Sequence, residues 1–334
     1  MTLQDVVARV AGGDARAADE VRARLDAKTK PRGSLGRLEE LACRLAFAQA
    51  GPPRVDATIV VAAADHGVAE EGVSAYPQEV TRQMLANFEQ GGAAINVLAR
   101  AAGVDVRFVD CGVGAATGNI ADGPAMTQAA ASAQIGAGVE LAEALAASGT
   151  TVIALGEMGI ANTTAASALV AALLPARADE VCGRGTGLDD EGVERKRDAV
   201  RRALTANALA LADPVETLAA LGGHEIAFLV GVVLGGAANC TTILLDGFIT
   251  GAAALVAARI APRASDAMVA AHVSPEPGHA LVLAELGLEP LLDLRLRLGE
   301  GTGAALALPL LRAATAIVDE MATFEAAGVT DAGR

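Results

Sequence analysis

Short, unbroken runs of apolar residues alternate along most of the chain with longer stretches of helical periodicity. Most of the runs are rich in β-branched residues and do not alternate between apolar and polar side chains, which is typical of strands covered on both faces. Because they alternate with helical stretches, they predict βαβ units and a mostly parallel α/β sheet flanked by helices. Five runs are too short to be helices: Thr58–Ala64, Val104–Val109, Thr151–Leu155, Thr241–Leu245 and Met268–Ala271.

The N-terminal region has a different pattern. Its first ~50 residues have apolar positions at helical spacing, with a break at Lys30–Gly33, and Pro52 and Pro53 end the region. We therefore predict two domains. A large α/β domain with a Rossmann-like sheet spans 57–300, and a small helical domain combines 1–56 with 301–334.

Composition excludes several classes of protein. The chain of 334 residues carries a formal net charge of −14 and has only 2% aromatic residues. It would therefore repel nucleic-acid phosphates, and it has few side chains on which bases could stack. Its 4 cysteines lie far apart without a CxxC pair, which fits a reducing cytoplasm. The chain does not begin with the charge and hydrophobicity pattern of a signal peptide. We expect a cytoplasmic protein that binds no nucleic acid.

One segment has the length of a membrane span. The 20 residues Ile226–Leu245 contain no charge. However, Gly235–Gly236, Asn239 and Thr241–Thr242 divide the segment, and no basic residues flank it. We therefore predict a buried helix, a turn and a buried strand here, and no interaction with a membrane.

Polar residues and glycines follow each predicted strand. Any one of these turns could be an ordinary helix cap. The carboxyl ends of parallel strands, however, share one edge of the sheet, where ligands bind. Five such turns together indicate a crevice for a small polar ligand: Asp65–Val68, Asp110–Gly114, Gly156–Gly159, Asp246–Gly247 and His272–Ser274.

Two glycine-rich segments suggest that this ligand carries a phosphate. In Gly156–Thr164 a strand leads into a helix whose first amides could face an anion. Cys182–Gly187 is a second such loop, with Lys196 in the helix that follows. Neither is a Walker loop, and no GxGxxG follows a strand in register, so a nicotinamide-cofactor dehydrogenase is not favoured. The loops suggest a phosphate or ribose phosphate without specifying a nucleoside triphosphate.

A single carboxylate lies between glycines in Leu298–Gly303. Glu300 follows a segment of alternating leucines, and burial beside them would raise its pKa and suit it to act as a general base. From spacing alone, an exposed Glu on a flexible turn remains an alternative. The histidines form no HxxxH or HxH pair, and no carboxylates have ligand spacing, so we expect no metal and no other cofactor.

Seven motifs follow one another along the chain: DHGV (Asp65–Val68), GVSAYPQEVT (Gly72–Thr81), NFEQGGAAINVLAR (Asn87–Arg100), GEMGIANTT (Gly156–Thr164), GRGTGLDDEG (Gly183–Gly192), LDGFI (Leu245–Ile249) and LRLGEGTGAALALPLL (Leu296–Leu311). With these motifs the chain resembles the nicotinate-nucleotide:dimethylbenzimidazole phosphoribosyltransferase family. The resemblance runs from Lys30 to Leu311, most of the chain. Seven ordered motifs are far more specific than a single glycine loop.

The resemblance implies an enzyme that moves the 5-phosphoribosyl group of nicotinate mononucleotide to 5,6-dimethylbenzimidazole. Its products are α-ribazole 5′-phosphate and nicotinate, with inversion at the anomeric carbon. Because the leaving group is already a pyridinium, it needs no general acid, and one base for the benzimidazole proton is enough. The family's base falls on Glu300 of the GEGTG motif, which makes a catalytic Glu300 the favoured interpretation.

The resemblance also implies residues that bind the two substrates. The phosphoribosyl group is expected at Glu157, Gly159, Lys196, Asp246 and Ser274, with Lys196 at the phosphate and Asp246 at a ribose hydroxyl. The acceptor base is expected at Ser74, Tyr76, Gln83 and Leu298. From the residues alone, a surface Lys196, a helix-capping Asp246 and a structural turn at Tyr76–Pro77 remain alternatives.

Two positions depart from the family's motifs. Ala161 stands where the family has Gly, and Ala271 where Ser is common. We expect both to affect affinity more than activity. Family members are homodimers, so a homodimer that acts on two small molecules is expected. The alternative function is a non-catalytic protein of the same fold that binds a nucleotide or a benzimidazole, for which a base at Glu300 would have no use.

Overall fold

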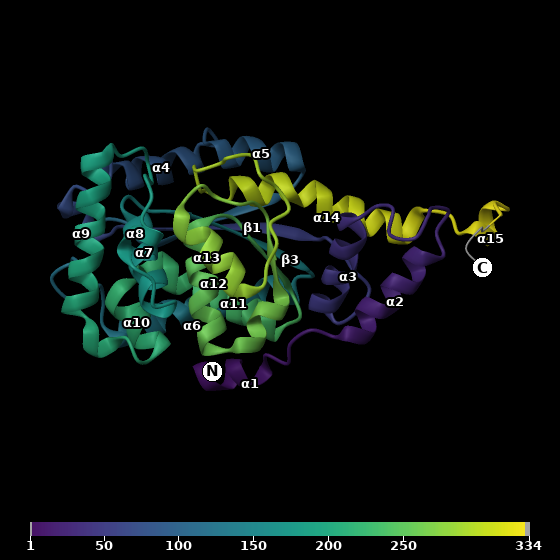
Figure 1. Ribbon diagram of the computed structural model, residues 1–334, viewed down its shortest axis with the longest axis horizontal. Coiled ribbons are helices and arrows are strands. Elements are labelled where there is room, and N and C mark those ends of the chain that lie inside the picture. The colour runs from purple at the N-terminus through teal and green to yellow at the C-terminus, as the bar shows by residue number, and fades with distance from the viewer. Residues whose placement is uncertain (1, 331–334) are drawn as a thin grey trace.

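A computed structural model describes residues 2–330 and confirms the α/β fold (Figure 1). All strands of the single sheet are parallel, and their order is β2-β1-β3-β4-β5. The chain adds β2 on one side of β1 and the later strands on the other side, so the strand order switches between β1 and β3. Ligands of such open sheets bind outside the carboxyl ends of the strands. All five predicted strands are present: β1 (Ala57–Ala64), β2 (Asp105–Gly112), β3 (Val152–Met158), β4 (Thr242–Leu245) and β5 (Met268–Ala270).

Two strands differ from the sequence-based prediction. β3 continues beyond its predicted end because Gly156, Glu157 and Met158 pair with β1. Glu157 therefore lies on the strand itself and not in the turn after it. β2 is an edge strand that exposes Asp105 and Arg107, so it is not covered on both faces.

Helices connect the strands and cover the sheet. Helix α11 followed by β4 confirms the prediction for the uncharged segment Ile226–Leu245, and α11 is buried along nearly its whole length. The α-helices are α1 (Leu3–Arg9), α2 (Ala15–Asp26), α3 (Arg37–Gln49), α4 (Glu79–Glu89), α5 (Ala94–Ala102), α6 (Gln128–Ala147), α7 (Asn162–Leu173), α8 (Ala178–Val181), α9 (Asp190–Ala206), α10 (Pro214–Leu221), α11 (His224–Ala238), α12 (Phe248–Ile260), α13 (Pro277–Leu286), α14 (Thr302–Glu320) and α15 (Phe324–Ala327). Short 3₁₀ turns occur at Gly67–Glu71, Ala208–Ala210 and Pro262–Ala267.

The two faces of the sheet belong to separate apolar cores. Successive strand residues point to opposite faces. Val60 and Ala62 of β1 join a core with α6, α7, α11 and α12. Ile59 and Val61 join a second core with α3, α5 and α14. Burial on both faces explains why the central strands read as unbroken apolar runs.

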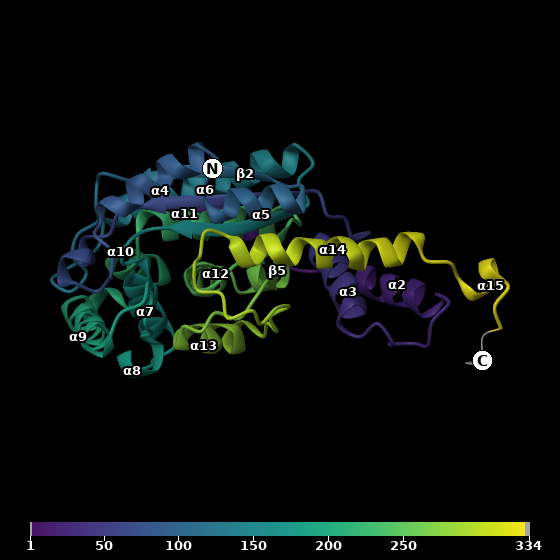
Figure 2. The same cartoon turned by 90° about the horizontal axis from the view of Figure 1, so that it is seen from above.

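Helices α2, α3 and α14 pack together, and α2 and α14 extend beyond the sheet (Figures 1 and 2). Helix α1 packs instead on α11, at the first core. The division into 57–300 and a helical domain of 1–56 with 301–334 stays a prediction. Within residues 2–330, α14 is the one helix long and apolar enough to cross a membrane, but half of its apolar window is buried, as in a helix of a protein core.

Candidate active site

A cavity of about 360 Å³ lies at the carboxyl ends of β3, β4 and β5. Its wall is completed by the segment before α14, the glycine loop before α9 and part of α4. Within residues 2–330, no three His, Cys, Asp or Glu side chains are grouped as metal ligands. Seven of the ten site residues predicted from the sequence line the cavity: Tyr76, Glu157, Gly159, Asp246, Ser274, Leu298 and Glu300.

The polar turns after β1 and β2 do not line this cavity, contrary to the sequence-based expectation. Asp65 Oδ2 accepts a hydrogen bond of 2.7 Å from the Gly114 backbone N–H. His66 Nε2 lies 2.7 Å from Glu225 Oε1, and both side chains are buried. Because these groups bond to protein partners, the crevice is confined to the ends of β3, β4 and β5.

Glu300 lies in a turn with an unusual backbone. Gly299, Glu300 and Gly301 have φ angles of +81°, +62° and +84°. This region costs a residue with a Cβ atom about 1–2 kcal/mol. The turn packs directly on Gly156 of β3, where a Cβ atom would lie 2.6 Å from the carbonyl carbon of Glu300. Backbone strain of this kind is concentrated at functional sites, so the turn is a candidate for the reacting centre.

Asp246, which follows β4, holds this turn in place. Its Oδ2 accepts a hydrogen bond of 3.2 Å from Gly301 N, and its Oδ1 accepts one of 3.0 Å from Ala304 N. It thereby satisfies two backbone donors at the start of α14. Burial raises the pKa of Asp246, and His272, whose Nε2 lies 3.6 Å from Oδ1, opposes the rise. Asp246 is therefore a helix-capping residue that also lines the cavity.

The Glu300 side chain is buried at the cavity, with 4% of the residue exposed. Burial raises the pKa of Glu300 and nearby Asp246 raises it further, whereas the Ile95 backbone N–H lowers it. Among the described residues, Glu300 Oε2 has no hydrogen-bond partner. The alternative of an exposed Glu on a flexible turn is therefore wrong. The geometry instead offers a desolvated carboxyl oxygen that can take up a proton.

Glu157 is a second buried carboxyl group in the wall. Burial raises the pKa of Glu157 to about 8, against a hydrogen bond that Asn162 Nδ2 donates to its Oε2. The neighbouring carboxylates Glu225, Asp246 and Glu300 add to the rise. At neutral pH Glu157 therefore holds a proton that it can donate in a hydrogen bond to a ligand.

Lys196 is fully buried and does not belong to the wall of the cavity. Its Nζ lies 3.6 Å from Glu276 Oε2 and 3.4 Å from the Gly183 carbonyl oxygen. Glu276 does line the cavity, and its Oε1 accepts a hydrogen bond of 2.8 Å from Gly185 N. Glu276 is not among the site residues predicted from the sequence, where its one signal is its position just after His272–Ser274. Lys196 is not a surface residue, so that alternative is wrong.

The four residues expected at the acceptor base are only partly brought together. Tyr76 and Leu298 line the cavity, and their exposed fractions of 55% and 58% provide apolar surface for a flat ring. Ser74 is outside the wall, but its Oγ lies 3.2 Å from Thr186 Oγ1 and so ties the segment before Tyr76 to the glycine loop. Gln83 is exposed on α4 and outside the wall.

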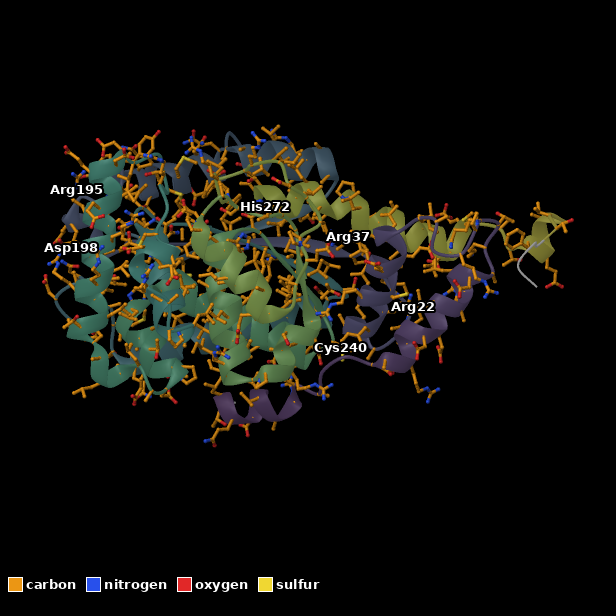
Figure 3. The ribbon with its side chains drawn as sticks, viewed as in Figure 1. Arg22, Arg37, Arg195, Asp198, Cys240 and His272 are labelled. Carbon is orange, nitrogen blue, oxygen red and sulfur yellow. The ribbon has the colours of Figure 1, made fainter. Side chains whose placement is uncertain are left out.

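The two departures from the family's motifs lie at buried positions away from the cavity wall. Ala161 precedes α7 with a φ of +75°, in the left-handed region that favours glycine. Its methyl group is therefore accommodated at a conformational cost of about 1 kcal/mol. Ala271 is fully buried in the second core. The next residue, His272, lies in the interior of the α/β body, far from Arg195 and Asp198 on the outer helix α9 (Figure 3).

The parallel sheet has glycine loops and carboxyl groups at its carboxyl edge, and comparison with known proteins identifies the class of enzyme as the phosphoribosyltransferases. A family model described as "Phosphoribosyltransferase" (DBI_PRT) matches residues 10–329. The chain is 48% identical, over an alignment of 335 positions, to nicotinate-nucleotide–dimethylbenzimidazole phosphoribosyltransferase of Halalkalibacterium halodurans, covering 96% of this chain and 94% of that one. It is 51% identical, over an alignment of 349 positions, to the enzyme of that name from Solidesulfovibrio magneticus, covering 98% of this chain and 99% of that one. The chain belongs to the nicotinate-nucleotide–dimethylbenzimidazole phosphoribosyltransferase family.

Solved structures agree with this membership. The crystal structure of CobT from Thermus thermophilus superimposes with a TM-score of 0.88 at 49% identity, over 94% of this chain and 99% of that one. A second structure, of the phosphoribosyltransferase from the same organism, gives a TM-score of 0.89 at 48% identity, over 95% and 99%. The fold and the enzyme class are thus those that the sequence motifs implied.

Proposed function

We propose that this enzyme transfers the 5-phosphoribosyl group of nicotinate mononucleotide to 5,6-dimethylbenzimidazole. The products are α-ribazole 5′-phosphate and nicotinate, with inversion at the anomeric carbon. One observation supports this proposal most directly: the strained turn that presents the buried Glu300 carboxyl to the cavity, with a free oxygen. The names of the relatives point to the same two substrates.

In the proposed reaction, Glu300 acts as the general base. The bond between the anomeric carbon and the pyridinium nitrogen breaks, and its electron pair stays on the nicotinate ring. The acceptor nitrogen that carries a free lone pair forms the new bond from the opposite face, and the N–H proton on the other nitrogen of the acceptor ring passes to the Glu300 carboxylate. Carboxylates around the cavity favour the positive charge that builds up on the ribose ring. Activity should be lost as the pH falls through the raised pKa of Glu300, since only the carboxylate accepts the proton.

Each remaining site residue is assigned to the part of the substrates that it is expected to bind. Glu157, Gly159, Asp246 and Ser274 face the ribose, and the protonated Glu157 can donate to a ribose hydroxyl. Lys196 acts at the phosphate from behind the glycine loop. The acceptor ring lies between Tyr76 and Leu298, with Ser74 and Gln83 expected close to it. No cofactor is needed for this reaction. We also propose that the enzyme is a cytoplasmic homodimer, as expected for its family.

The transfer itself is tested with the purified protein, nicotinate mononucleotide and dimethylbenzimidazole. Chromatography should show nicotinate released in equal amount to the α-nucleotide, and little release when the acceptor is omitted. A protein that binds both compounds but releases no nicotinate would instead be the non-catalytic binding protein of the same fold. Release of nicotinate without the α-nucleotide would make the enzyme a hydrolase and contradict the proposal.

A further inference from the structure

The cavity contains one basic residue whose charge the assigned roles do not use. Arg297 is the sole lysine or arginine among the residues that line it. The guanidinium of Arg297 makes no hydrogen bond or ion pair with any residue in the described part of the chain, 2–330. Arg297 is exposed, and an unpaired guanidinium that lines a cavity with several carboxyl groups can bind an anionic group of a ligand.

Arg297 lies over the glycine loop that precedes α9. One of its terminal nitrogens lies 3.9 Å from the position that a Cβ atom of Gly187 would occupy. Gly185, at the other end of this short stretch, is close to Lys196 and to the Thr163 hydroxyl at the start of α7. The stretch 185–187 is therefore flanked by a buried cation on one side and by Arg297 on the other, next to a helix N-terminus.

Two other cations near this loop already have partners. Arg184 donates to the Leu188 carbonyl oxygen and forms an ion pair with Asp190. Lys196 is paired with Glu276, whose carboxylate lines the cavity. A phosphate next to Glu276 would be repelled unless a cation compensates. Lys196, which is proposed to act at the phosphate, carries a single charge that Glu276 already offsets, so a second cation is needed. Arg297 is the remaining charge that can compensate the phosphate.

We propose that Arg297 binds the 5′-phosphate of the donor, holding it against the 185–187 stretch. This inference rests on the proposed function for the identity of the donor. Leu298 and Glu300 lie in the same segment. A phosphate held by Arg297 would therefore also fix the positions of Leu298, at the acceptor ring, and of Glu300, the proposed base. Arg297 is thus a donor-binding residue that links the occupied phosphate site to the geometry of the turn.

Calorimetric binding to two donors tests this role independently of turnover. Nicotinate mononucleotide and nicotinamide mononucleotide share the phosphate, and only the first carries a ring carboxylate. Arg297→Met should weaken the binding of both to the same extent, by about 10- to 100-fold, as expected for the loss of a charge-assisted contact. Arg297→Lys should restore part of the affinity, since it keeps the charge but loses the planar fork.

Arg295→Met is the matched control, because it removes an exposed charge two residues away that does not line the cavity. It should leave both dissociation constants unchanged. Weaker binding of the nicotinate compound alone would assign Arg297 to the ring carboxylate and overturn the proposal, as would unchanged binding of both. Since binding is measured without dimethylbenzimidazole, a wild-type enzyme that binds both donors but transfers neither would contradict the proposed function and leave this result intact.

Discussion

Two carboxyl groups face the cavity from different elements, and burial acts on both in the same direction. Glu157 comes from β3 and Glu300 from the turn before α14, and the pKa of each is raised. Their hydrogen bonds differ, since Asn162 donates to Glu157 whereas Glu300 Oε2 has no partner among the described residues. At the scale of single residues, this difference suits Glu157 to hydrogen bonding with a ligand and Glu300 to its proposed role as the proton acceptor.

The pH dependence of stability tests the environment of Glu157. Its pKa rises from 4.5 to about 8 on folding, so between these values the folded protein keeps a proton that the unfolded chain has lost. The contribution of Glu157 to stability is therefore complete below pH 4.5 and is lost as the pH rises through about 8. In the Glu157→Gln variant the side chain is neutral at every pH, so this decrease in stability with rising pH does not occur.

Denaturant unfolding of wild type and Glu157→Gln at a series of pH values provides the measurement. The free energy of unfolding of the variant, relative to wild type, should increase with pH by up to about 1 kcal/mol per pH unit in this window. Because both proteins contain the same other titrating groups, the contributions of those groups cancel in the difference between the two free energies of unfolding. A difference that does not change with pH would show that Glu157 is ionised in the folded protein at neutral pH.

Single residues also show what sequence reasoning could and could not find. Glu300 was identifiable because it falls on the GEGTG motif of the family, whereas its flanking glycines and leucines alone left an exposed turn open. The structure shows that the residue is buried in a strained turn. Glu276 has no such local signal. Its importance comes from its contacts with Gly185 and Lys196, which are remote in sequence. Pairings of this kind depend on the tertiary fold and cannot be read from spacing.

At the scale of elements, the site depends on the close packing of β3 against the turn that begins α14. Gly156 permits this approach because any Cβ atom there would meet the backbone of Glu300 and Gly301 at 2.6 Å. Asp246 fixes the turn from the neighbouring strand. The position of Glu300, the proposed base, is therefore set by three elements that are distant in the chain.

Substituting Gly156→Ala should displace the turn and with it Glu300, the proposed base. We expect turnover to fall by tenfold or more, since a displacement of about 1 Å can cost on the order of 100-fold. Stability should fall by about 1–3 kcal/mol, as for other overpacked positions. Steady-state kinetics and denaturant unfolding measure the two effects. Gly136→Ala is the control, because a Cβ atom there would meet nothing within 4 Å. Unchanged turnover of Gly156→Ala would show that the turn does not need this contact.

At the scale of the whole molecule, the sheet was predictable and the extent of the crevice was not. Central strands such as Thr242–Leu245 are buried on both faces, so their apolar runs were recognisable. All five polar turns were expected to meet, yet those after β1 and β2 bond to protein partners such as Gly114 and Glu225. Local sequence predicts that a strand ends in polar residues, but only the tertiary structure decides which of them stay free for a ligand.

The central claim is that Glu300 removes the proton of the acceptor base, and one variant tests it most directly. Glu300→Gln keeps the shape of the side chain but cannot accept the proton. It should reduce the turnover of nicotinate mononucleotide with dimethylbenzimidazole by about 100-fold or more, the usual range for a lost general base. Circular dichroism and donor binding close to wild type would show that the variant is folded. A folded Glu300→Gln enzyme with near-normal turnover would contradict the role of Glu300.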